Sequence, residues 1–247
     1  MKRKLILSST ILFLFALIGS FFFFETKNYW LQFYFDATQD NPAVTSKADI
    51  DKVLHQFETI SYKKLDKAYL DHTLSNDKRF KNMLRKSTYY KVPQSALNQK
   101  LVGHFRIKHF MGKDQYLRDC VLGRVDTIIW LMDKRVIYKT LELQDELEKA
   151  GYDRNAFVVY NGHRAPQYNE LIKGARKSRH IKGEAVDISI KDIDRNGRIN
   201  SEDKKIVLNL LDKKIIRNSG GLGLYPGTQS VHYDVRGRRA RWNSYKR

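Results

Sequence analysis

The residues best suited to do chemistry begin in the stretch SRHIKGEAVDI, at positions 178–188. It places His180 ahead of Asp187, with Gly183 between them at a point where the chain can turn. Apolar and polar side chains alternate across residues 184–190, which predicts a strand with Asp187 on its polar face. A carboxylate in the middle of a strand is costly to bury without a partner. We therefore expect the turn to bring the His180 imidazole next to Asp187.

A second alternating stretch lies at residues 230–236, where His232 and Asp234 share one face. If the two strands are neighbours, His180, Asp187 and His232 can converge. Two imidazoles and one carboxylate, with a fourth position left for water, form the ligand set of a catalytic zinc ion. Spacing alone leaves the alternative open that these histidines are structural or lie on the surface.

Three segments resemble the zinc D-Ala-D-Ala carboxypeptidase-like peptidases, the M15 group. SRHIKGEAVDI matches the S-x-H-x-x-G-x-A-x-D signature of that group, and YNGHRAP at 160–166 is similar to its SGYRSP segment. GGLGLYPGTQSVHYDVRGRRARW at 220–242 resembles the C-terminal segment of the YcbK-like members. The resemblance covers about residues 100–247 and implies a fold of the hedgehog and D-Ala-D-Ala peptidase type.

The resemblance also implies roles for individual residues. His180, Asp187 and His232 take the places of the zinc ligands. Arg164 takes the place of an arginine that holds and polarises the substrate carbonyl, a role that suits a fixed positive charge. The implied activity is hydrolysis of peptidoglycan stem peptides or cross-links, as a D,D-carboxypeptidase or an endopeptidase. The YcbK-like segment favours the endopeptidase.

The catalytic base is less well defined by the sequence. The D-Ala-D-Ala dipeptidases of the group have a glutamate three residues before the last histidine ligand, where this chain has Gln229. Asp234 is the other candidate, and it could either activate the water or only orient a ligand. Gln229 also motivates an alternative from another class, a cell-wall-binding module that keeps its metal without catalysis. His163 is expected to line the cleft and not to bind metal.

The segment DIDRNGRINSED at 192–203 fits the twelve-residue calcium loop of EF-hands and dockerins. The expected ligands are Asp192, Asp194, Asn196, the backbone carbonyl of Arg198, and Asp203. Gly197 would permit the sharp turn, and Ile199 would anchor the loop to the core. The alternative is a polar turn without an ion, because two arginines weaken the local negative charge. A single loop of this kind indicates a structural ion and not a switch.

The periodicity predicts the elements that must position these residues. Helices are expected over about 116–132, 141–150, 166–173 and 201–213, and strands over 157–160, 185–190 and 230–236. Together they predict an α+β domain at 100–247, with a small antiparallel sheet and flanking helices. Residues 25–99 are expected to form a juxtamembrane helical segment, either a small spacer or a packing subdomain, with a boundary near Val92-Pro93.

The N-terminus, residues 1–24, indicates export. A basic start precedes an uncharged apolar run from Leu5 to Phe24, which as a helix would rise roughly 30 Å. The basic end is expected to stay in the cytoplasm, so the rest of the chain would be periplasmic or extracellular. The absence of a small-residue cleavage pattern favours a single-pass membrane anchor over a cleaved signal.

Charge and cysteine content limit the possible binding partners and exclude disulfide bonds within the chain. The formal net charge of +19 suits an anionic membrane, an anionic cell-wall polymer or nucleic acid, and the alternative is a solvated basic surface without a specific partner. Export argues against nucleic acid. The resemblance implies peptidoglycan peptides as the partner, and the N-terminal anchor implies the membrane. One cysteine, Cys120, excludes an intramolecular disulfide. The expected cofactors are Zn²⁺, from the resemblance and the ligand set, and Ca²⁺ as a structural ion, from the loop 192–203.

Overall fold

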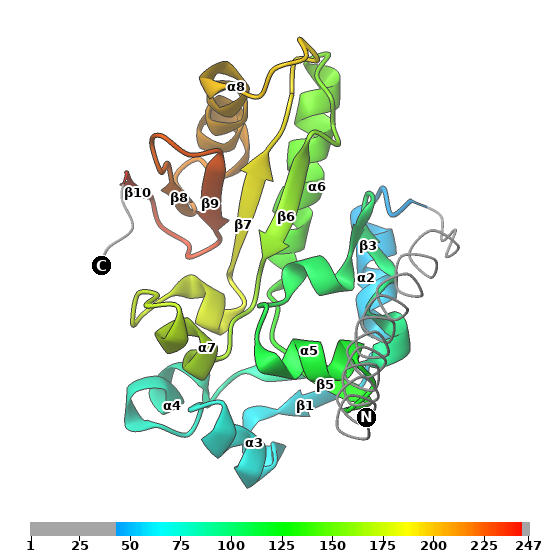
Figure 1. Cartoon of the computed structure of the whole chain (residues 1–247), viewed down its shortest axis with the longest axis vertical. Helices are drawn as coiled ribbons and strands as arrows, with labels where there is room; N and C mark the ends of the chain where they lie inside the picture. The colour runs from blue at the N-terminus through cyan, green and yellow to red at the C-terminus, as the bar shows by residue number, and fades with distance from the viewer. Residues whose placement is uncertain (1–42, 244–247) are drawn as a thin grey trace, which may run out of the picture. The chain divides into compact units, whose positions relative to one another are not determined.

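A five-stranded sheet carries the residues of interest (Figure 1). The computed structural model describes residues 43–243, apart from the side chains of residues 115 and 116. The sheet has the order β10–β8–β9–β7–β6. Its strands are β6 (Phe157–Asn161), β7 (Ala185–Ile190), β8 (Gly221–Gly223), β9 (Ser230–Asp234) and β10 (Ala240–Trp242). Neighbouring strands are antiparallel except β10 and β8, which are parallel. The predicted α+β class with a small antiparallel sheet is confirmed.

Alternation along the strands fixes the apolar face of this sheet. Val186 and Ile188 of β7 are fully buried, and they join one hydrophobic cluster with Val231 and Tyr233 of β9. Helix α6 (Lys134–Lys149) packs into the same cluster through its apolar stripe, which includes Ile137. The other face of β7 is thereby left to Asp187.

Helices flank the sheets. They are α2 (Lys47–His55), α3 (Lys67–His72), α4 (Lys78–Leu84), α5 (Gln115–Val121), α6 (Lys134–Lys149), α7 (Pro166–Leu171) and α8 (Ser201–Leu210). A π-helical turn, Leu211–Ile215, continues α8, and α6 packs against α8. Helix α7 opens on Pro166, whose missing N–H would have no intrahelical partner in the first turn.

The helix expected over 116–132 is wrong in its second half. Helix α5 ends at Val121, Gly123 follows with φ 71°, and Thr127–Trp130 form strand β5. The glycine permits the left-handed backbone that ends the helix, and the β-branched pair Ile128-Ile129 favours a strand.

The segment at 25–99 is not purely helical in the part that the structure describes. Besides helices α2 to α4 it contains β1 (Thr59–Ser61) and β2 (Thr88–Pro93), and these form a three-stranded sheet in the order β1–β2–β5. The expected boundary at Val92-Pro93 lies inside β2, whose hydrogen-bond partner is β5. A short hairpin of β3 (Lys100–Val102) and β4 (Phe105–Arg106) follows.

These N-terminal elements share the core of the C-terminal ones. Ile50 and Leu54 of α2 belong to the same hydrophobic cluster as Ile137 and Val186. The described residues accordingly fall in one compact unit. The expected anchor at 1–24 lies outside the described residues. Within residues 43–243 there is no helix with the length and apolar character needed to cross a bilayer.

Candidate metal centre

The strand register places three site residues in one row across the sheet. Asn161 of β6 pairs with Asp187 of β7, and Asp187 pairs with His232 of β9. Directly opposed residues on neighbouring strands project their side chains to the same face. The alternation seen in the sequence therefore does bring His232 beside Asp187.

His180 reaches this row from a short 3-10 helix, Arg179–Lys182, that ends immediately before β7. Gly183 caps that helix with φ 65°, in the left-handed region. A Cβ atom at Gly183 would lie 2.2 Å from the carbonyl oxygen of Leu131, which is closer than atoms can approach. Glycine is thus required at this turn, both for its backbone angle and for space.

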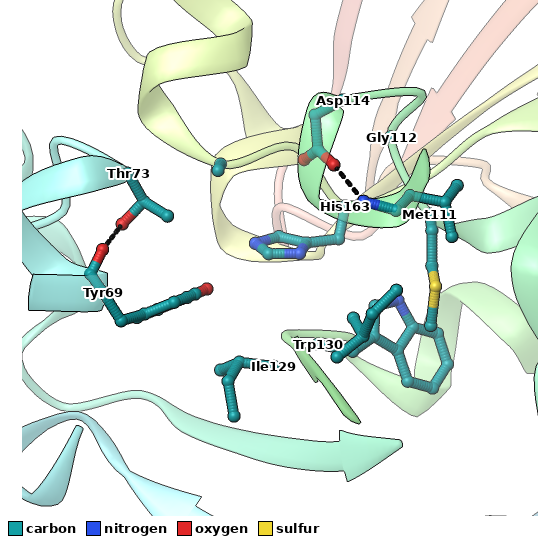
Figure 2. A pocket seen from close by; sticks show the side chains of 11 residues that line it. Tyr69, Thr73, Met111, Gly112, Asp114, Ile129, Trp130 and His163 are labelled. Atoms are coloured by element: carbon teal, nitrogen blue, oxygen red, sulfur yellow. Dashed lines mark hydrogen bonds between the residues drawn. The ribbon is translucent and has the colours of Figure 1, made fainter. Parts of the chain in front are cut away.

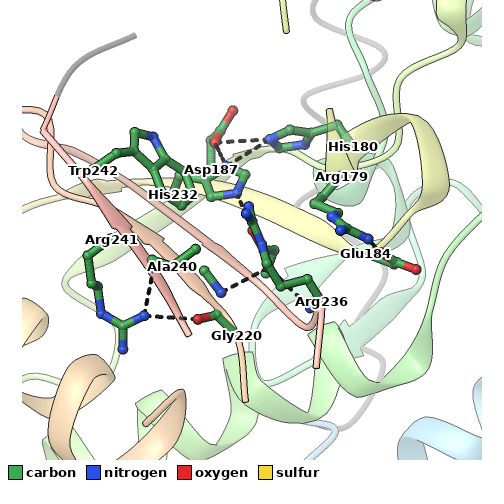
Figure 3. Close-up of polar contacts among 12 residues, drawn as sticks. Arg179, His180, Glu184, Asp187, Gly220, His232, Arg236, Ala240, Arg241 and Trp242 are labelled. Carbon is green, nitrogen blue, oxygen red and sulfur yellow. Dashed lines mark hydrogen bonds and ion pairs between the residues drawn. The ribbon is translucent and has the colours of Figure 1, made fainter. Parts of the chain in front are cut away.

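The donor atoms of His180, Asp187 and His232 form a compact triangle (Figure 3). Nε2 of His180 lies 3.1 Å from Oδ1 of Asp187 and 3.1 Å from Nδ1 of His232. Nδ1 of His232 lies 2.9 Å from Oδ1 of Asp187. Ligands of a tetrahedral zinc ion with bonds of 2.0–2.1 Å are about 3.3 Å apart. The triangle is slightly tighter than that, and all three side chains are buried.

The outer nitrogen of each imidazole fixes its tautomer. Nδ1 of His180 lies 2.7 Å from the carbonyl oxygen of Gly162, which can only accept, so Nδ1 carries the proton. Nε2 of His232 lies 3.2 Å from the Asp234 carboxylate and likewise donates. Both inner nitrogens then direct a lone pair into the triangle. These are the tautomers that a metal ion requires, and the outer acceptors are those usual for ligating histidines.

Charge in this buried site also favours a cation. Burial lowers the pKa of His180 and keeps that imidazole neutral. Burial acts in the same direction on His232, but hydrogen bonds to Asp187 and Asp234 outweigh it and raise the pKa of His232. The two carboxylates thus attract positive charge to the triangle, where a metal ion can replace a proton. The residues present fit a zinc ion.

The second oxygen of Asp187 is held by two donors. Oδ2 accepts hydrogen bonds from Nη2 of Arg164 at 2.5 Å and from Nδ2 of Asn161 at 2.9 Å. Burial acts to raise the pKa of Asp187, yet the interactions with His180 and His232 prevail and hold that pKa well below its usual value. No role for Asn161 was predicted from the sequence, where its only signal was its place in YNGHRAP.

Arg164 is nine-tenths buried beside these ligands, with 11% of its side chain exposed. Its Nε atom is buried without a hydrogen-bond partner among the described residues. An unsatisfied buried donor is costly, so an acceptor that a ligand brought to this N–H group would be bound favourably.

Asp234 lies behind His232. The carboxylate is fully buried, and it accepts hydrogen bonds from Gly221 N at 2.9 Å and from Nε of Arg236 at 2.8 Å. Burial acts to raise the pKa of Asp234, and the His232 and Arg236 contacts more than offset this and lower it. Because it contacts Nε2 and not the inner Nδ1, its position fits the orienting role left open by the sequence.

Gln229 does not point to the triangle either. Its Nε2 donates a hydrogen bond of 2.9 Å to the carbonyl oxygen of Asn200, in the acidic loop 192–203. The position at which the related dipeptidases have their glutamate therefore faces a different part of this chain.

His163 lines a small pocket (Figure 2). The pocket has a volume of about 20 Å³, room for roughly one water molecule, and Tyr69 and Trp130 are among its other walls. Nδ1 of His163 accepts a hydrogen bond from Leu131 N at 3.5 Å, and burial lowers the pKa of the imidazole to about 3. Among the described residues, two groups of side chains have donor atoms close enough together to bind a metal ion, and His163 belongs to neither.

The acidic loop brings together three of its predicted ligands. Carboxylate oxygens of Asp192, Asp194 and Asp203 all lie within 4.8 Å of one another. Asp192 and Asp194 accept hydrogen bonds from backbone N–H groups of residues 196 and 197. Asp203 is fully buried and accepts from the N–H groups of residues 193 and 200. These hydrogen bonds hold the three carboxylates in place within the loop.

The Asn196 side chain accepts from Arg198 N at 2.9 Å, so Arg198 follows it in a tight turn. Ile199 was expected to anchor the loop, and this is wrong because it is 52% exposed. Ile193 is fully buried in the main core and provides the anchor. Ile193 is buried because it lies close to the end of β7, whereas the loop pattern had pointed to Ile199.

Comparison with known families agrees with this geometry. Residues 132–234 match the family described as Peptidase M15. The matched region runs from just before α6 to the end of β9 and contains Arg164, His180, Asp187 and His232. Neither a curated protein nor a solved structure matches the chain.

Proposed function

We propose that the chain is a zinc-dependent peptidase acting on peptidoglycan stem peptides or cross-links, and the match of residues 132–234 to the Peptidase M15 family supports this. The observation that supports zinc is the triangle of His180, Asp187 and His232, with donor separations of 2.9–3.1 Å and both outer imidazole nitrogens bound to acceptors.

Each residue of the site then has a part in hydrolysis. A bound zinc ion would supply an activated water and polarise the substrate carbonyl. Arg164 offers its unsatisfied Nε–H to the same carbonyl oxygen and stabilises the negative charge that develops there. Asn161 and Arg164 together hold the outer oxygen of Asp187, so that Oδ1 stays directed at the two histidines. Asp234 orients His232.

The substrate proposal rests on the resemblance of the C-terminal segment and on charge. Cross-links are favoured over D-Ala-D-Ala termini because the segment 220–242 resembles that of the YcbK-like members. The net charge of +19 suits an anionic wall polymer. We place the domain outside the cytoplasm, periplasmic or extracellular, tethered by a single-pass anchor at residues 1–24.

Incubation of the protein with purified peptidoglycan, with and without a zinc chelator, tests this proposal, with mass spectrometry of muropeptides as the readout. Conversion of cross-linked dimers to monomers only without chelator would establish an endopeptidase. Loss of one terminal alanine would establish a carboxypeptidase. Unchanged muropeptides together with co-sedimentation of the protein and the wall would favour the alternative, a binding module, for which Gln229 and its bond to Asn200 supply the structural reason.

We further propose a structural calcium ion in the loop 192–203. Its support is the convergence of Asp192, Asp194 and Asp203. Calorimetric titration with Ca²⁺ should give a saturable isotherm that the double substitution Asp192→Asn, Asp194→Asn removes. Glu202→Gln is the matched control, because Glu202 is exposed and pairs with Lys205 at 2.7 Å. Absence of any heat in the unsubstituted protein would leave a polar turn without an ion.

A further inference from the structure

The row that contains the metal ligands continues to the edge of the sheet. Trp242 of β10 pairs with Gly223 of β8, and Gly223 pairs with His232 of β9. Gly223 has no side chain, so nothing from β8 separates the indole of Trp242 from the imidazole of His232. The two ring centroids are 5.2 Å apart, with the planes inclined by 56° (Figure 3).

Glycine at position 223 is what permits this contact. A Cβ atom there would lie 2.9 Å from Nε1 of Trp242 and 2.9 Å from the Tyr225 ring. The indole is also fixed at its far end, since Nε1 donates to the Tyr225 hydroxyl at 3.3 Å and the Trp242 carbonyl accepts from Leu224 N at 2.8 Å. The ring is therefore a fixed wall beside His232.

The next row of paired residues, Gly221 and Asp234, contacts the outer nitrogen of His232, Nε2, through the Asp234 carboxylate. Gly221 pairs with Asp234, and a Cβ atom at Gly221 would lie 2.3 Å from Oδ2 of Asp234. Arg236 binds that carboxylate through Nε at 2.8 Å and Nη2 at 2.5 Å. The Arg236 guanidinium in turn lies 5.0 Å from the centre of the Trp242 ring, within the range of a cation–π contact.

We propose that Arg236 and Trp242 are positioning residues that hold His232 in its metal-ligating orientation. Arg236 fixes the Asp234 carboxylate, the carboxylate fixes Nε2 of the imidazole, and Trp242 packs against the ring. An imidazole held at its outer nitrogen and packed on one side loses little freedom when its inner nitrogen binds a metal. Both residues lie outside the 132–234 family match.

This inference rests on the proposed zinc site, and it is tested on zinc affinity and not on turnover. The variants are Arg236→Gln, Trp242→Ala and Trp242→Phe in the full chain. Arg239→Gln is the matched control, since Arg239 is on the same segment and contacts Asp212 instead. The readouts are the zinc dissociation constant, from competition with a chromophoric chelator, and the visible spectrum of the Co²⁺-substituted protein.

We expect Arg236→Gln and Trp242→Ala to weaken zinc binding by about 10-fold to 100-fold, the range seen for partners of metal-ligating histidines. Trp242→Phe keeps an aromatic wall and should recover most of the affinity, with a Co²⁺ spectrum close to that of the unsubstituted protein. Arg239→Gln should change neither readout. Rescue by phenylalanine separates positioning of the ligand from a general loss of stability, which thermal unfolding of the metal-free variants measures in parallel.

Two negative results have different meanings. If the unsubstituted protein binds zinc and both Arg236→Gln and Trp242→Ala bind it equally well with unchanged Co²⁺ spectra, the positioning inference is overturned and the zinc site stands. If the unsubstituted protein binds no zinc, the proposed function itself fails.

Discussion

Nδ1 of His232 lies 2.9 Å from Oδ1 of Asp187 because the two residues are direct cross-strand partners on β9 and β7. Their separation is set by sheet register and not by any local turn. A slip of one residue in either strand would send one of the two side chains to the opposite face. The candidate metal centre therefore depends on every contact that fixes the pairing of β7 with β9, including the burial of Val231 and Tyr233.

Replacement of Asp187 by asparagine should abolish zinc binding, because the amide removes the only carboxylate in the triangle. We expect at least a 100-fold loss of affinity and a metal content near zero by elemental analysis. The metal-free variant should also unfold at lower temperature, since Arg164 loses its charged partner in a buried setting. Glu148→Gln is the control, as Glu148 is exposed and pairs only with Arg154 among the described residues. Full zinc occupancy in Asp187→Asn would exclude the assigned ligand set.

Replacement of Arg164 by lysine should separate chemistry from metal binding. Lysine keeps the charge but cannot offer both Nη2 to Asp187 and Nε to a substrate carbonyl. We expect kcat to fall by about 100-fold or more, the usual result of losing an oxyanion donor, while zinc content stays near one per chain. Arg176→Lys is the control, because Arg176 is exposed. Equal activity in Arg164→Lys would show that the guanidinium does not contact the reacting carbonyl.

His163 should make the protein less stable in mild acid. Its pKa is about 3 in the folded chain and about 6.5 in the unfolded chain, because burial disfavours the charged form. Between these values the unfolded state binds one more proton, so the free energy of unfolding rises with pH by about 1.4 kcal/mol per unit. This contribution is complete above pH 6.5 and is lost as the pH falls towards 3.

The substitution His163→Phe should remove that contribution and keep the ring shape. Chemical denaturation of the metal-free protein at pH 7.5 and pH 5 should show that the variant gains about 2 kcal/mol relative to the unsubstituted protein at the lower pH. His55→Phe, at an exposed position on α2, should show no such gain. A parallel pH dependence in His163→Phe would mean that His163 is not the group responsible.

Substitution of Gly183, at the turn before β7, should strongly destabilise the protein. Gly183→Ala combines an unfavourable backbone angle, φ 65°, with a contact of 2.2 Å to the Leu131 carbonyl oxygen. Gly227→Ala is a matched control, because φ is 78° there but no atom lies within 4 Å of the added Cβ. The control should cost about 1 kcal/mol from backbone strain alone, and Gly183→Ala distinctly more, with weaker zinc binding as His180 is displaced. Equal losses in the two variants would show that the close contact relaxes freely.

The sequence by itself determined which side chains could meet at the candidate metal centre. Alternation in residues 184–190 and 230–236 assigns Asp187 and His232 to polar faces, because neighbouring residues of a strand point to opposite sides. The glycine between His180 and Asp187 likewise indicated a turn, and the structure has one at that point. These are local properties, and the α+β class follows from them as well.

Only the tertiary structure decided which side chains contact the outer nitrogens and ring faces of the candidate ligands. Asp234 and His232 share a strand face, yet the alternation could not show that the Asp234 carboxylate contacts the outer nitrogen of His232. Nor could it show that Gly221 N and Arg236 hold that carboxylate in place. The contact between Trp242 and His232 depends on the register of three strands and on the empty place at Gly223. The pairing of β2 with β5 made residues before 100 part of the same core. Such contacts join residues far apart in the chain, and periodicity carries no information about which distant strand becomes the partner.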